Sequence, residues 1–237
     1  MSKEPASKPA DEGPPLAPRW HTALLIALLV AVALVGTWLT AAGVPLARPA
    51  RDGRVLGVYG VYLPLVAVNL GMAAYVCRVG RARSALSSLL GRGWDGAWRA
   101  GADLALAVAL WSLVEAVESV AGAGSWRNAA VAALLPHTYA EKAAWVLVAA
   151  TVGFCEELVY RGYLQTQLTA FTRRAGLAVA LQAVLFGVAH GEQGLAVVAR
   201  FTLYGVLFGA LARWRRSLVP GIVAHVALDV ASGLLAS

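Results

Sequence analysis

Long runs without charged residues, separated by short basic segments, dominate the chain. The first run, from His21 to Gly43, consists mostly of alanine, leucine and valine. It is long enough for one membrane-spanning helix, which needs roughly 20 apolar residues. A signal peptide is the alternative, but its apolar core is shorter, roughly 7–15 residues, and it does not follow a charged tail such as residues 1–20. The pattern therefore predicts a first span.

Six further apolar runs follow, each of helical length. They lie at residues 56–77, 103–120, 143–168, 175–190, 194–211 and 218–236. Between the second and third runs, residues 84–98 contain Trp94 and Trp98, which suit the headgroup level of a bilayer. We expect an all-α, polytopic transmembrane helical bundle of about seven spans, with an interfacial segment after the second.

The same pattern divides the chain into three parts. Residues 1–20 are rich in proline and charged residues and are predicted to be a disordered N-terminal tail. Residues 21–142 contain three N-terminal transmembrane spans with the interfacial segment. Residues 143–236 contain the four remaining spans and carry most of the chemistry considered below.

Composition and charge agree with a membrane protein. Hydrophobic residues make up 59% of the 237 residues and charged residues 14%, against about 45–50% and about 25% in ordinary soluble domains. The net charge of +7 would suggest nucleic-acid binding only if it formed a basic face on a soluble domain. Instead, thirteen of the twenty lysines and arginines fall in the tail and in the loops on its side, and five on the other. The positive-inside rule therefore predicts a cytoplasmic N-terminus, and no nucleic-acid partner is expected.

A few ionisable side chains lie inside the apolar runs, where each is costly, roughly 2.5–3.5 kcal/mol for Arg or Asp. The fourth run contains Glu156, Glu157 and Arg161. Glu157 and Arg161 share a helix face at i and i+4 in the favourable order, so we interpret them as a structural pair. Glu156 points elsewhere and has no local partner, which leaves it available as a general base.

Two histidines accompany these charges on other spans. His190 ends the fifth run, four residues after Phe186, and the seventh run carries His225 and Asp229 on one face. A histidine on an apolar helix is commonly a hydrogen-bonded core residue, and a Glu–Arg pair is commonly a structural bridge. Several independent polar pairs on separate apolar helices nevertheless favour a function.

These pairs resemble the three motifs of the CPBP family, also called Abi. The family comprises CAAX prenyl endopeptidases of the Ras-converting type and bacterial bacteriocin-processing relatives. The matching motifs are Glu156-Glu157-x-x-x-Arg161, Phe186-x-x-x-His190 and His225-x-x-x-Asp229. Their order and their placement on separate helices match. The resemblance implies that residues 143–236 form the catalytic helical core of an intramembrane endopeptidase.

The resemblance also implies roles for single residues. Glu156 and His190 would activate a water, and His225 with Asp229 would stabilise the oxyanion. The prenyl proteases commonly carry Asn where this chain has Asp229. Asn can donate a hydrogen bond to an oxyanion and an ionised Asp cannot. Either Asp229 is protonated, or it only orients His225, and this departure weakens a specific expectation of prenyl-CAAX cleavage.

Neither a metal nor another cofactor is expected. The family was first thought metal-dependent and is now mostly described as glutamic, and the sequence has no HExxH helix. Zinc is the alternative, because two histidines and a carboxylate can bind it. The expected partners are the lipid bilayer and a membrane-anchored or lipidated peptide or protein substrate. The family's spread and the Ala-, Val-, Leu- and Arg-rich composition indicate a multi-pass protein of a bacterial cell membrane.

Two other functions fit the same pattern. One is a non-catalytic membrane scaffold or bacteriocin-immunity protein of the same fold. The other is a transporter in which Arg200 and the interior carboxylates line an ion path, although the hydropathy shows no inverted repeat. The expected depths of the candidate catalytic residues in the membrane do not all agree. Counted along the predicted helices, Glu156 and His225 fall near the cytoplasmic third of the bilayer. His190 falls nearer the outer side, about 22 Å from the inner end of the fifth run.

Overall fold

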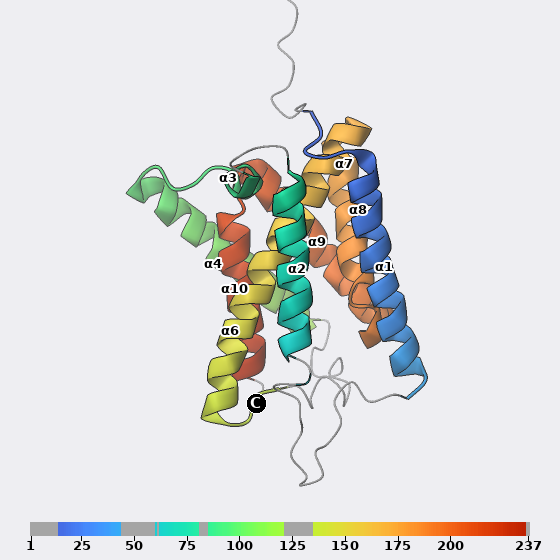
Figure 1. Ribbon diagram of the computed structural model, residues 1–237. Helices are drawn as coiled ribbons and strands as arrows, with labels where there is room; N and C mark the ends of the chain where they lie inside the picture. The colour runs from blue at the N-terminus through green and yellow to red at the C-terminus, as the bar shows by residue number, and fades with distance from the viewer. Residues whose placement is uncertain (1–13, 44–59, 61, 81–84, 121–134, 236–237) are drawn as a thin grey trace, which may run out of the picture.

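The computed structural model describes residues 14–43, 60, 62–80, 85–120 and 135–235, and almost all of them are helical (Figure 1). The elements are α1 (Arg19–Ala41), α2 (Leu63–Val79), α3 (Ala85–Leu90), α4 (Ala97–Val120), α6 (Tyr139–Glu156), the π-helix η3 (Glu157–Leu164), α7 (Gln165–Thr172), α8 (Ala175–Val188), the 3₁₀ turn η4 (Gly191–Gln193), α9 (Leu195–Arg215) and α10 (Val219–Leu234). No β-strand occurs in these ranges, so the all-α prediction is confirmed.

The described helices include four that are long and apolar enough to cross a membrane. They are α1, α4, α9 and the continuous rod of α6, η3 and α7. Three shorter apolar helices, α2, α8 and α10, run beside them. The predicted polytopic helical bundle is therefore confirmed, with four helices of spanning length and three shorter apolar ones in place of seven equal spans. Helix α4 begins at Ala97, before the predicted third span, so Trp98 is helical, and α3 occupies part of the expected interfacial segment.

The N-terminal segment is more ordered near the bundle than the sequence predicts. Residues 1–13 of the predicted tail lie outside the described residues. The backbone amides of Leu16 and Ala17 donate to Oε1 of Gln167 at 2.6 and 3.3 Å, and α1 already begins at Arg19. Because a buried glutamine on α7 pairs with this backbone, residues 14–20 are fixed to the bundle.

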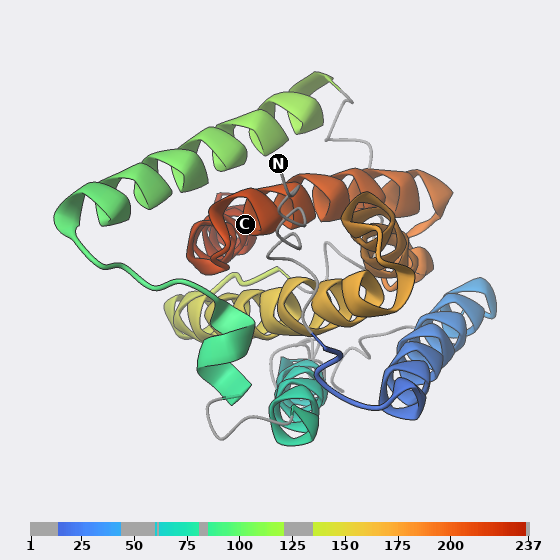
Figure 2. The same ribbon diagram turned by 90° about the horizontal axis from the view of Figure 1, so that it is seen from above.

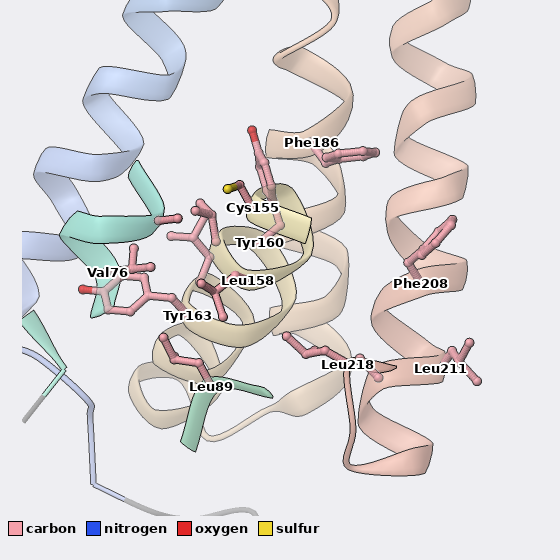
Figure 3. Close-up of a cluster of buried hydrophobic side chains, with 14 of the residues drawn as sticks. Val76, Leu89, Cys155, Leu158, Tyr160, Tyr163, Phe186, Phe208, Leu211 and Leu218 are labelled. Atoms are coloured by element: carbon pink, nitrogen blue, oxygen red, sulfur yellow. The ribbon is translucent and has the colours of Figure 1, made fainter. Parts of the chain in front are cut away.

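The rod of α6, η3 and α7 lies at the centre of the bundle. Helices α2 and α10 pack against α6, while α8 packs against η3 and α7 and pairs closely with α9 (Figure 2). Helix α1 lies against α8 and η4, and α4 crosses the outer side of α10. The core is built around η3, whose Leu158, Tyr163 and Leu164 are at most 1% exposed (Figure 3).

Two glycines allow α8 and α9 to approach closely. A Cβ atom on Gly205 would lie 2.6 Å from the Cα of Ala183, so only glycine fits there. The amide Nε2 of Gln182 donates to the carbonyl of Gly205 at 2.8 Å, and that of Gln165 donates to the carbonyl of Gly209 at 3.1 Å. Small residues four apart are typical of closely packed membrane helices, and here they also let buried amides reach the backbone.

Candidate active site

Glu156 and His190 lie at the same height in the bundle. Glu156 precedes the end of α7 at Thr172 by 16 residues, and His190 follows the start of α8 at Ala175 by 15. At 1.5 Å per residue, both lie about 22–24 Å from the turn that joins the two helices. The sequence had predicted that Glu156 lies nearer the cytoplasmic side than His190. That prediction was wrong, because Glu156 belongs to a helical rod of 34 residues that extends well beyond one span.

Glu156 occupies the boundary between two kinds of helix. It is the last residue of α6, and the π-helix η3 begins at the next residue. The sequence predicted an ordinary α-helix here. Helices of the π type are rare and frequently occur at functional sites. The Glu156 side chain is 15% exposed, and its Oε2 atom lies 3.7 Å from Nε2 of His225.

His225 is held from its other ring nitrogen by a buried carboxylate. Its Nδ1 lies 2.9 Å from Oε1 of Glu157, whose side chain is fully buried. The same Oε1 lies 2.9 Å from Nη1 of Arg161. A carboxylate paired with an arginine only accepts hydrogen bonds, so Nδ1 of His225 carries its proton towards Glu157. Nε2 therefore faces Glu156.

Aromatic rings surround the Arg161 guanidinium. It lies 4.3 Å from the ring centre of Phe186 and 5.3 Å from that of Phe208. Such cation–π contacts stabilise a charge that water does not reach. On α10, Gly221 leaves room for Glu157, because a Cβ atom there would lie 3.2 Å from Oε2 of Glu157.

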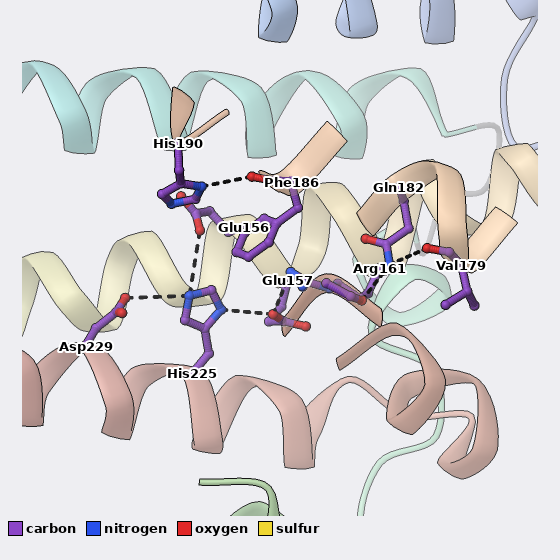
Figure 4. A network of polar contacts seen from close by, with 10 residues as sticks. Glu156, Glu157, Arg161, Val179, Gln182, Phe186, His190, His225 and Asp229 are labelled. Atoms are coloured by element: carbon purple, nitrogen blue, oxygen red, sulfur yellow. Dashed lines mark hydrogen bonds and ion pairs between the residues drawn. The ribbon is translucent and has the colours of Figure 1, made fainter. Parts of the chain in front are cut away.

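His190 is oriented by backbone and by an aromatic stack. Its Nδ1 lies 2.8 Å from the carbonyl oxygen of Phe186, which can only accept, so Nδ1 is the donor (Figure 4). In the neutral ring, Nε2 then keeps its lone pair. The imidazole stacks on Phe201 at 3.8 Å between ring centres with 18° between the planes. No motif spacing connects Phe201, on α9, with His190, so the sequence did not identify it.

Asp229 approaches the same nitrogen of His225 as Glu156 does. Its Oδ2 lies 3.7 Å from Nε2 of His225, and its side chain is 35% exposed (Figure 4). Its backbone carbonyl accepts a hydrogen bond of 2.8 Å from Nε1 of Trp145 on α6. Two carboxylates thus flank one imidazole nitrogen. The hydrogen bond from Trp145 to Asp229 connects α6 with α10 next to them.

Other charged residues of the apolar runs do not join this cluster. Asp103 accepts from Nε of Arg215 at 2.7 Å and from Nε1 of Trp94 at 3.2 Å, far along the chain from the three motifs. Glu115 is exposed on α4. The Arg200 guanidinium lies 5.6 Å from the ring centre of Phe201. The side chain of Glu118 lies outside the described residues.

The donor atoms of the site do not form an evident metal centre. In the part of the chain that the structure describes, no three histidine, cysteine, aspartate or glutamate side chains are placed to hold one ion together. One nitrogen of each histidine is engaged, by the Glu157 carboxylate and by the Phe186 carbonyl, and Nε2 of each ring is left to face the site. The metal-free mechanism stays a prediction, and no step below uses a metal.

Comparison with known proteins agrees with the motifs. No curated protein and no solved structure shows a significant match to the chain. One family model does match residues 138–231, and it describes type II CAAX prenyl endopeptidases that are Rce1-like. This range contains all three motifs. The resemblance to the CPBP family is thereby confirmed by a match that covers residues 138–231 of the chain.

Proposed function

We propose that the protein is an intramembrane endopeptidase that hydrolyses a peptide bond with a water activated by Glu156 and His190. The observation that carries the proposal is the convergence of three helices on one small polar cluster. Glu156, His225 and Asp229 meet at a single imidazole nitrogen, and His190 lies beside Glu156 (Figure 4). Interior ionisable groups of this kind are costly in a membrane and usually functional.

The first step is activation of water. The Phe186 carbonyl holds the Nδ1 proton of His190, so its Nε2 accepts a hydrogen bond. The Glu156 carboxylate also accepts. A water between them donates both hydrogens, which leaves its lone pairs free to attack the scissile carbonyl. Glu156 takes the proton as general base and later delivers it to the leaving amine, a role that contributes typically about 10²–10⁴-fold to the rate.

The second element is stabilisation of the oxyanion. Glu157 fixes the ring of His225 through Nδ1. A proton on Nε2 can then be donated as a hydrogen bond to the negatively charged oxygen that develops on the scissile carbonyl. Removing one such donor costs about 2.7–4 kcal/mol in comparable sites. Asp229 carries its carboxylate 3.7 Å from Nε2. This supports the view that it orients His225 and does not itself donate.

The substrate class follows from the location of the site. A peptide bond can reach side chains inside the bundle only if its chain lies in or enters the bilayer. We therefore propose a membrane-anchored or lipidated peptide or protein as substrate, with prenylation not required, and a multi-pass location in a bacterial cell membrane. The chemistry needs no cofactor, because Glu156 and His190 together supply base and positioning.

The decisive experiment compares Glu156→Gln with Glu115→Gln in the purified full-length protein. Both changes remove one carboxylate, but Glu115 lies exposed on α4, away from the cluster. Cleavage of a panel of lipidated and membrane-anchored peptides, read by mass spectrometry, should fall at least about 10²-fold in Glu156→Gln and stay unchanged in Glu115→Gln.

A chelator arm tests the metal-free mechanism. Activity that survives dialysis against a strong chelator is the expected result, and loss with restoration by zinc would contradict it. Unchanged cleavage in Glu156→Gln would sink the proposed base. If the wild-type protein cleaves nothing in the panel and nevertheless binds the peptides, the observation favours the non-catalytic scaffold.

A further inference from the structure

Two adjoining cavities lie at one end of the bundle. The first cavity, of about 350 Å³, lies between η3, α7, α3 and the end of α9, and the second, of about 380 Å³, lies between α7 and the segment that leads into α1. Pro14 and Ala170 line both, so the cavities share a wall. They lie at the end of the molecule where α7 and α9 terminate and α1 begins (Figure 1).

Arginine is the charged residue of both cavities. Arg161, Arg213 and Arg216 line the first cavity, and Arg19 and Arg173 line the second. No acidic side chain among the described residues lines either of them. The hydroxyls of Ser88, Thr166 and Thr169 add hydrogen-bonding groups to the first cavity. Such a wall is suited to a phosphate, which arginine binds with charge-assisted and often bidentate hydrogen bonds.

Two of these arginines occupy an unfavourable backbone conformation. Arg173 ends α7 with φ of 57°, and Arg216 ends α9 with φ of 51°. They are the non-glycine residues with positive φ in the described part of the chain. Glycine is the usual residue at such a helix end, because other residues are strained there. Each of these two arginines lines one of the two cavities.

The surrounding residues place the cavities at the membrane surface. Trp20 follows Arg19 at the start of α1 and is 61% exposed, and Trp214 lies near the end of α9 and is 69% exposed. Exposed tryptophans mark the headgroup level of a bilayer. A basic pocket between helices at this level is typical of sites for anionic lipid headgroups.

We propose that the two cavities bind the phosphate headgroups of an anionic phospholipid. The arginines at the helix ends compensate the phosphate charge and the hydroxyls hold its oxygens, while the acyl chains lie along the apolar helices. The site meets the catalytic cluster only at Arg161, which lines the first cavity but whose charge is balanced by Glu157. The proposal does not depend on the proposed peptidase activity.

The test measures lipid binding to the purified full-length protein in detergent. Phosphatidylglycerol, phosphatidylcholine and inorganic phosphate are added separately, and the unfolding temperature and the lipid retained in native mass spectrometry are recorded. Phosphatidylglycerol should raise the unfolding temperature more than phosphatidylcholine does. In the Arg173→Gly/Arg216→Gly variant the affinity for phosphatidylglycerol should fall about 25-fold, since each basic residue near an anionic surface contributes about fivefold.

The matched control is Arg78→Gln/Arg174→Gln, which removes two exposed arginines that line neither cavity. This control should keep the phosphatidylglycerol effect. Without lipid, the glycine variant should unfold no earlier than the wild type, because glycine relieves the positive φ. If that variant does not fold, Arg173→Asn/Arg216→Asn serves instead, since Asn tolerates the same conformation.

Three results would overturn the proposal. An equal effect of phosphatidylcholine would show that the headgroup charge is not recognised. An equal loss in the glycine variant and in the control would show only a general attraction to the basic surface. A shift reproduced by inorganic phosphate at the same concentration would assign the cavities to a free anion and not to a lipid.

Discussion

At the scale of single residues, the two histidines differ in the group that holds their Nδ1 proton. His190 donates to a neutral backbone carbonyl, and His225 donates to the buried carboxylate of Glu157. The first arrangement leaves Nε2 as an acceptor suited to water. The second places a negative charge behind the ring and suits a histidine that carries positive charge when the oxyanion forms. Glu157 is therefore more than the partner of Arg161, and we expect it to position His225.

Glu157→Gln tests this role. Glutamine has almost the same shape, but it cannot balance the buried Arg161, and breaking such a pair costs about 3–5 kcal/mol. We expect reduced stability and reduced kcat in the variant. The double variant Glu157→Gln/Arg161→Gln removes both charges and should recover part of the stability, since no charge is left unpaired.

The double variant separates structure from positioning. If Glu157 only supports the fold, kcat should recover together with the unfolding temperature. If it orients His225, kcat should stay low while stability returns, with KM little changed. Thermal unfolding and peptide cleavage measured on the same preparations distinguish the two outcomes.

At the scale of elements, two features decide where the site lies. The π-helix η3 begins directly after Glu156, and its eight residues are all buried. The close contact of α8 with α9 holds Phe201 against the ring of His190. The geometry of the polar cluster thus depends on an unusual helix and on a helix pair that only glycine allows.

Gly205→Ala should loosen the α8–α9 pair. The added methyl would lie 2.6 Å from the Cα of Ala183 and 2.8 Å from its Cβ, so the helices must separate. Overpacking of this kind costs typically about 1–3 kcal/mol. Gly71→Ala is the matched control, because it adds the same methyl to an exposed position of α2 with no atom within 4 Å.

Thermal unfolding in detergent measures both variants. Gly205→Ala should unfold at a lower temperature, and Gly71→Ala should match the wild type or exceed it, since alanine is the better helix former. An unchanged unfolding temperature in Gly205→Ala would contradict the tight contact between α8 and α9.

The elements themselves were largely predictable, and their contacts only in part. Apolar runs predicted the helices because each span must bury its backbone hydrogen bonds in lipid. The i, i+4 spacing predicted which residues share a face, such as Glu157 and Arg161. The bond from Glu157 to His225 joins residues 68 positions apart, and the stack of Phe201 on His190 depends on how α8 and α9 pack. No local sequence pattern predicts those contacts, and none predicts a π-helix.

At the scale of the whole molecule, most basic residues of the described helices gather at one end, where Trp20 and Trp214 are also exposed. The starts of α1 and α10 and the ends of α7 and α9 lie there, while α1 and α10 end on the opposite side (Figure 1). The positive-inside rule assigns the basic end to the cytoplasm. His190 and Glu156 then lie about 22–24 Å from the cytoplasmic turn between α7 and α8. Glu156 belongs to the rod of α6, η3 and α7, whose 34 residues exceed the roughly 20 that cross the hydrocarbon layer.

Cysteine labelling tests this orientation. In a background with Cys77→Ala and Cys155→Ala, single cysteines replace Tyr139, which is 94% exposed at the start of α6, or Arg174, which lies exposed in the turn between α7 and α8. A membrane-impermeant maleimide applied to intact spheroplasts should label Tyr139→Cys and should label Arg174→Cys only after the membrane is opened. The reverse pattern would place the basic end outside, against the positive-inside rule. Because the same turn is the reference for the depth of Glu156 and His190, the labelling also decides from which side of the membrane their depth of about 22–24 Å is counted.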